Sequence, residues 1–277
     1  MRLGGPVFVD KLTPDAWIAA LQHKGYRAAY CPLWADASVG ERSEYRAAAA
    51  EADIVIAEVG AWSNPLSSDR AIADAAYRTI VDALRLADDI GAVCCVNIAG
   101  SRGAKWDGPD RRDMTEETFA MIVDLVRRIL SEAAPTTARY TLEPMPWMYP
   151  DSAHSYQRLL DAIDHPGFAV HYDPVNMINS PPKYFQNGTE MASFIKALGP
   201  RIVSVHAKDI VLRDELTTHL DECIPGDGAL DYPTFLAELA RLDDDLPLMT
   251  EHLKTEAEYD RAADAIRGFA AAAGVGL

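Results

Sequence analysis

The chain has 277 residues, of which 49% are apolar, so it can fill a large core. Acidic residues outnumber basic ones by 42 to 26, and the resulting charge of −16 disfavours nucleic acids and anionic membranes as partners. No apolar run reaches the roughly 18 residues of a membrane span, and no secretion signal is recognisable at the start, so we expect a cytoplasmic protein.

Short apolar segments alternate with helix-like segments eight times along the chain. We expect strands at residues 2–8, 26–32, 53–62, 92–100, 139–144, 168–174, 201–209 and 247–253. We expect helices beginning near residues 14 and 116, and further helices at 41–52, 68–89, 153–164, 188–199, 231–242 and 256–272. A long loop is expected at 210–230. The strands are continuously apolar, as buried parallel strands are, and the pattern predicts a single (β/α)8 TIM barrel domain over residues 1–277.

Polar side chains stand where the chain leaves the last four expected strands. Glu143, Asp173, His206 and Glu251 occupy these positions. The carboxyl ends of barrel strands form the functional face, and strand alternation allows all four side chains to point into the barrel mouth. Charges inside a barrel must be paired or bound to a metal. Three carboxylates and one imidazole therefore predict a site for one divalent cation.

Each of these four residues also has a simpler interpretation. A single glutamate at a strand end is more often a salt-bridge or cap partner, and a single buried histidine is more often hydrogen-bonded in the core. Four such residues at equivalent positions on consecutive strands are better explained by a shared ion. The oxygen-rich donor set suits Mn²⁺ or Mg²⁺, and it can accept Co²⁺ or Zn²⁺.

Five segments carry a resemblance to a known family: LEPMPW, HYDPVN, VHAKD, IPGDGALDY and TEH. They resemble the sugar (phosphate) isomerase/epimerase family with the xylose-isomerase-like TIM barrel, which includes ketose 3-epimerases, hydroxypyruvate isomerase, inosose dehydratase and endonuclease IV. The resemblance covers most of the chain and places the family's four metal ligands on the same four strand-end residues. Endonuclease IV is a poor match, because its trinuclear site needs more histidines and a basic face.

The resemblance implies a metal-dependent isomerase or epimerase that acts on a small keto-sugar or sugar acid through a metal-stabilised enediolate. Glu143 and Glu251 would each be both ligand and acid/base. Lys208 would stabilise negative charge on an oxygen or orient Glu251, unless it simply pairs with Asp209 or another carboxylate. A dehydratase or decarboxylase of a keto-sugar acid would share the enediolate and stays an alternative. A non-catalytic sugar-binding barrel would predict a broken ligand set, whereas this set is whole.

Two departures from the family pattern bear on the substrate. Ketohexose epimerases of the family have a histidine at the position of Asn176 and an arginine at the position of Glu222. The loss of both argues against an ordinary free ketohexose bound in that manner. An acidic residue in place of the arginine also argues against a phosphate group at that end of the substrate.

Three more residues are candidate substrate contacts. His171 shares a strand face with Asp173, and Trp147 lies in the loop after the fifth strand, where it is a pocket wall or a loop-packing residue. Arg102 follows the fourth strand and can recognise a carboxylate or phosphate, or it is a solvated loop charge. The expected partner is a small carbohydrate. A homo-oligomer is compatible with the resemblance, but no stripe in the sequence identifies an interface.

Overall fold

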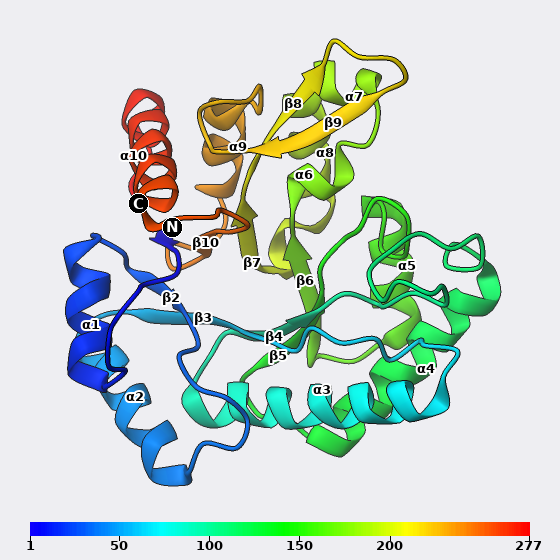
Figure 1. The fold of residues 1–277 in the computed structure, drawn as a ribbon, viewed down its shortest axis with the longest axis horizontal. Helices are drawn as coiled ribbons and strands as arrows, with labels where there is room; N and C mark the ends of the chain where they lie inside the picture. The colour runs from blue at the N-terminus through cyan, green and yellow to red at the C-terminus, as the bar shows by residue number, and fades with distance from the viewer.

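Eight parallel strands form a closed barrel at the centre of the molecule, for which a computed structural model describes residues 1–277 (Figure 1). The strands pair in the order β1-β10-β7-β6-β5-β4-β3-β2, and the ring closes between β2 and β1. They are β1 (Arg2–Gly4), β2 (Ala28–Tyr30), β3 (Val55–Gly60), β4 (Cys94–Asn97), β5 (Arg139–Leu142), β6 (Phe168–Tyr172), β7 (Ile202–Ala207) and β10 (Pro247–Thr250). This architecture confirms the predicted (β/α)8 TIM barrel.

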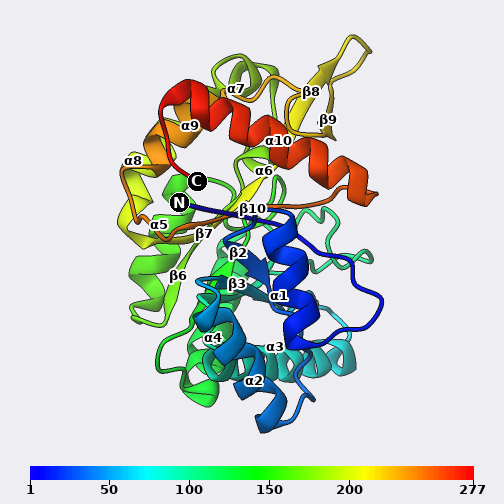
Figure 2. The same cartoon turned by 90° about the vertical axis from the view of Figure 1, so that its left-hand side faces the viewer.

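Helices connect the strands and surround the barrel (Figure 2). They are α1 (Pro14–His23), α2 (Val39–Glu51), α3 (Arg70–Ile90), α4 (Glu116–Ala133), α5 (Ala153–Ile163), α6 (Pro174–Met177), α7 (Pro181–Phe185), α8 (Asn187–Leu198), α9 (Tyr232–Leu239) and α10 (Glu256–Ala273). The side chains of Thr13, Thr115 and Ser152 cap α1, α4 and α5, where the sequence predicted helix starts. None of the helices combines the length and apolarity that crossing a membrane requires.

The segment predicted as a long loop at 210–230 contains an antiparallel hairpin instead. Its strands are β8 (Asp209–Arg213), which continues almost directly from β7, and β9 (His219–Cys223). No strand was predicted there because β9 and the turn are rich in charged residues, unlike a buried barrel strand. The hairpin projects from the same end of the molecule as α7 (Figures 1 and 2). It returns the chain, and with it Glu222, toward the barrel mouth.

Asp88 joins the end of α3 to the chain that enters β5. Its carboxylate accepts hydrogen bonds from the backbone N–H groups of Thr136, Thr137 and Ala138 at 2.9, 2.7 and 2.9 Å. Burial alone would raise the pKa of Asp88, but these donors outweigh burial and hold the pKa well below its usual value. The ionised carboxylate thus fixes the start of a strand that carries site residues.

We expect Asp88→Asn to lower the free energy of unfolding by about 2 kcal/mol at pH 7, because an ionised acceptor of several hydrogen bonds is lost. The folded-state pKa of Asp88 is lowered, so its contribution is present above the unfolded pKa of about 4 and is lost as the pH falls toward the folded value. Urea unfolding of both proteins at pH 7 and about pH 3 measures this difference. Asp74→Asn, on the exposed face of the same helix, is the control. Equal stabilities at pH 7 would contradict the assignment.

Candidate functional site

The four strand-end side chains predicted from the sequence converge at the mouth of the barrel. Nδ1 of His206, on β7, lies 3.0 Å from Oε2 of Glu251, 3.3 Å from Oε1 of Glu143 and 3.6 Å from Oδ2 of Asp173. One ligand atom from each of the four residues lies within 4.8 Å of all the others. We call this group the carboxylate–histidine cluster. Its members come from the adjacent strands β5, β6, β7 and β10.

Lys208 directs its ammonium group at the same carboxylates. Nζ lies 2.7 Å from Asp173 Oδ2, 2.8 Å from Glu251 Oε2 and 3.5 Å from Glu143 Oε1. Burial would lower the pKa of Lys208, but the facing carboxylates raise it well above its usual value. The predicted alternative was a pair with Asp209 or another carboxylate; the structure shows pairs with these other carboxylates and none with Asp209. Asp209 instead accepts backbone N–H groups of its own segment and of residues 226–230.

The cluster's donors fit a divalent cation. Asp173 Oδ2 and Glu251 Oε2 are buried, and the ammonium group of Lys208 faces them at 2.7 and 2.8 Å. Buried carboxylates are costly unless positive charge compensates them, and a divalent cation would supply more of it to three carboxylates than one lysine does. Three carboxylates and one imidazole form the mostly hard donor set that Mg²⁺ and Mn²⁺ favour. These four residues could therefore hold one such ion.

The two glutamates of the cluster differ in proton affinity. Burial is the largest effect on Glu143 and raises its pKa, although Lys208 and His206 oppose it. Burial acts in the same direction on Glu251, but the charges of His206 and Lys208 outweigh it and lower the pKa to about 2. Neighbouring carboxyl groups whose surroundings shift their pKa values in opposite directions are a recurrent feature of acid–base sites. Glu143 is therefore the more basic carboxylate of the two.

Asn176 and Glu222 both lie beside the cluster. Nδ2 of Asn176 donates to Oε1 of Glu143 at 2.9 Å, and its backbone N–H donates to Oδ1 of Asp173 at 3.2 Å. Glu222, on β9, lies 3.5 Å from Nζ of Lys208 and pairs with Nδ1 of His252 at 3.0 Å. His252 was not among the predicted site residues; its φ of +59° places it in the left-handed region directly after Glu251.

A cavity of about 640 Å³ opens beside Asn176 and Glu222. Trp147 forms part of its wall, and its indole N–H donates to the backbone oxygen of Asp107 at 2.9 Å. The hairpin contributes Leu220 as well as Glu222 to the lining, so the missed hairpin shapes this cavity. Of the predicted substrate contacts, the structure thus brings Trp147, Asn176 and Glu222 together.

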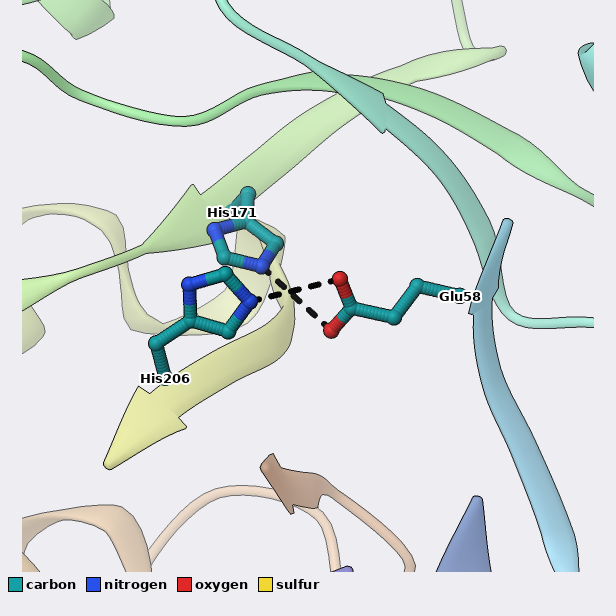
Figure 3. Close-up of side chains that lie close together, drawn as sticks. All are labelled: Glu58, His171 and His206. Carbon is teal, nitrogen blue, oxygen red and sulfur yellow. Dashed lines mark hydrogen bonds and ion pairs between the residues drawn. The ribbon is translucent and has the colours of Figure 1, made fainter. Parts of the chain in front are cut away.

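The other two predicted substrate contacts lie elsewhere. Arg102 forms an ion pair with Glu117 on α4 at 2.8 Å and also bonds Thr118, so its guanidinium is directed at the outer helix. His171 is completely buried beneath the cluster, where its Nε2 lies 3.5 Å from Glu58 (Figure 3). Neither residue lines the cavity beside Asn176 and Glu222.

Glu58 is the buried charge that the sequence analysis missed. It lies on β3 with 1% of its surface exposed, and it contacts His206 from the side opposite the cluster (Figure 3). A signal was available, because Glu58 is a charged residue inside an otherwise apolar run. A charged residue at such a position needs a partner inside the barrel.

Comparison with known proteins identifies the family to which the chain belongs. The model of the xylose isomerase-like TIM barrel matches residues 18–269. The chain belongs to this family. No curated protein sequence matches it significantly.

Several solved structures share the fold of this family member. D-Psicose 3-epimerase with D-tagatose, from Clostridium cellulolyticum H10, is 16% identical over 100% of both chains, with a TM-score of 0.70. A probable 3-DHS dehydratase from Bacillus anthracis is 16% identical over 93% of both chains, with a TM-score of 0.68. A xylose isomerase-like TIM barrel protein from Mycobacterium smegmatis, in complex with magnesium, is 13% identical over 95% of this chain and 90% of that one, with a TM-score of 0.66. At these identities the likeness concerns the fold.

Lys208→Met removes the ammonium group from among the buried carboxylates of this family member. We expect the free energy of unfolding to fall by about 3–5 kcal/mol in the presence of a chelator, because breaking a buried ion pair leaves charge uncompensated. Denaturant unfolding followed by circular dichroism measures the change. Lys105→Met, at a side chain that is 73% exposed, is the matched control and should be close to neutral. A Lys208 variant as stable as the control would contradict the electrostatic role.

Proposed function

We propose that the chain, as a single domain over residues 1–277, is a divalent-metal-dependent isomerase or epimerase of a small keto-sugar or sugar acid. One observation carries the proposal: three carboxylates and an imidazole from four neighbouring strands converge at the barrel mouth, with one ligand atom from each within 4.8 Å of all the others. Glu143, Asp173, His206 and Glu251 would hold the ion, with Mg²⁺ or Mn²⁺ as the preferred metal. The epimerase and the magnesium complex among the structural neighbours support this proposal.

The proposed chemistry is proton transfer next to a carbonyl group. When bound, the ion polarises the carbonyl of an α-hydroxycarbonyl substrate and makes the neighbouring C–H acidic. Glu143 and Glu251 lie on the two outer strands of the set β5-β6-β7-β10, so they face the site from different sides. One glutamate removes the proton and leaves an enediolate. Return of a proton to the opposite face of the same carbon gives the epimer, and its delivery to the former carbonyl carbon gives the isomer.

Other residues orient the acid–base pair and the substrate. Lys208 contacts Glu251 and Asp173, so it holds these carboxylates in place and offsets negative charge that develops nearby. Asn176 fixes Glu143 through its side-chain amide. Substrate hydroxyls would bind Glu222 and Asn176, with Trp147 forming a wall of the same cavity. Arg102 stays a weaker proposal as a substrate contact, since its ion pair with Glu117 must open first.

A lyase is the second candidate function. It is favoured by the dehydratase among the structural neighbours. A dehydratase would form the same enediolate and expel a hydroxyl group from the next carbon, with one carboxyl protonating the leaving oxygen. A decarboxylase would lose CO₂ from a keto-sugar acid instead. The carboxylate–histidine cluster serves all of these reactions, so the products must distinguish them.

Incubation with a panel of ketoses and keto-sugar acids in D₂O tests the proposal. With Mg²⁺ or Mn²⁺ present, we expect deuterium at the carbon beside the carbonyl of at least one substrate, with a product of unchanged formula apart from deuterium. Proton NMR and mass spectrometry measure both quantities. Release of water or CO₂ would indicate the lyase. Absence of exchange with every substrate, in protein shown to be metal-loaded, would contradict enediolate chemistry.

Replacing either glutamate tests the assignment of the acid–base pair. Glu143→Gln and Glu251→Gln should each lower kcat by about 10²–10⁴-fold, because the amide cannot transfer the proton. Glu238→Gln, on the outer helix α9, is the matched control and should keep full activity. Metal content is measured for each variant, so that loss of the ion is separated from loss of proton transfer. Full activity in both metal-loaded variants would contradict the assignment.

A further inference from the structure

The carboxylate of Glu58 lies inside the barrel, one layer below the carboxylate–histidine cluster. It receives a hydrogen bond from Oγ of Ser204 at 2.8 Å on Oε1. Nε2 of His206 lies 3.3 Å from its Oε2, and Nε2 of His171 lies 3.5 Å from its Oε1 (Figure 3). An ionised carboxylate only accepts hydrogen bonds. The nitrogen atoms that face it must therefore carry hydrogen to be favourable there.

This contact decides which nitrogen of His206 is free. A neutral imidazole carries hydrogen on only one of its two nitrogens. If Nε2–H faces Glu58, then Nδ1 has a lone pair, and Nδ1 is the atom that faces Glu143, Asp173 and Glu251. A lone pair directed at three carboxylates is repulsive by itself, but it becomes a fourth donor when a cation lies among them. A second carboxylate behind a metal-binding histidine is a known means of orienting such a ligand.

The topology makes this interaction possible. In the closed order of the barrel, β3 stands four places from β7 in both directions, so the two strands are directly opposite. Glu58 therefore reaches across the barrel interior to contact His206 and Ser204, which are 148 and 146 positions away in the sequence.

We propose that Glu58 is a positioning residue that holds His206 in its Nε2–H form and so reserves Nδ1 as a cation ligand. The inference rests on the proposed metal site and adds to it a residue from the opposite strand. Ser204 supports the arrangement by occupying Oε1, which leaves Oε2 for His206. His171 supplies a second imidazole that faces the carboxylate from β6.

A second cation held by Glu58, His171 and His206 is the competing explanation, because one donor atom from each residue lies close to the others. The hydrogen-bond interpretation is favoured for two reasons. Ser204 already donates to the carboxylate, and His206 would have to give both of its nitrogens to metals at once. The number of ions bound per chain distinguishes the two arrangements.

The first measurement is made on the wild-type protein, and one variant serves only to assign the signal. ¹⁵N–¹H NMR of histidine-labelled protein saturated with Zn²⁺ reports which nitrogen of His206 carries hydrogen, and loss of the signal in His206→Gln assigns it. We expect hydrogen on Nε2 and a metal-bound Nδ1. Hydrogen on Nδ1 would overturn the proposal, as would two bound Zn²⁺ ions per chain by elemental analysis.

The second measurement compares Mn²⁺ affinity by calorimetry among variants whose circular dichroism matches the wild type. Glu58→Met removes the acceptor and should weaken binding by about 10–100-fold. Glu58→Gln keeps an acceptor oxygen without the charge and should lie between Glu58→Met and the wild type. Glu51→Met, at an exposed position at the end of α2, is the matched control and should leave the affinity unchanged. Wild-type affinity in Glu58→Met would overturn the proposal, whereas a wild-type protein that binds no metal would contradict the proposed function itself.

Discussion

Burial of negative charge inside the barrel is the constraint on which the rest of the site depends. Glu58, Glu143 and Asp173 are almost completely buried, and Glu251 is mostly so. Uncompensated carboxylates at such depth would cost several kcal/mol each. The structure compensates them with two cationic or hydrogen-bonding residues, His206 and Lys208, which between them contact all four. The positions of the four carboxylates therefore depend on these two side chains.

His206 connects the two layers of charge. Its Nδ1 faces the cluster at the barrel mouth and its Nε2 faces Glu58 in the interior, so one imidazole ring contacts both sets of carboxylates. Lys208 lies on the same strand face two positions later and contacts the cluster from β7 as well. A single strand thus provides the positive side of the site, and β3, β5, β6 and β10 provide the negative side. Because these side chains come from strands on opposite sides of the barrel, the site forms only when the barrel is closed.

The sequence predicted the fold and the cluster because both are repeating features. Eight apolar runs mark the strands, and the strand-end position is occupied by a polar residue on four successive strands, which makes Glu143, Asp173, His206 and Glu251 visible together. Glu58 was missed because it stands alone in its strand and its partners lie on the opposite wall. The hairpin was missed because exposed strands rich in charge lack the apolar run of a barrel strand. The contacts of Arg102 could not be predicted, because they depend on how its loop packs against α4. The spacing of residues in the sequence gives no information on that packing.

Crystals grown with Mn²⁺ and measured for anomalous scattering test the central claim most directly. The account predicts one strong peak per chain, bonded to Glu143, Asp173 and Glu251 through carboxylate oxygens and to His206 through Nδ1. A peak bonded to His206 through Nε2, or no peak among these residues at saturating Mn²⁺, would contradict it.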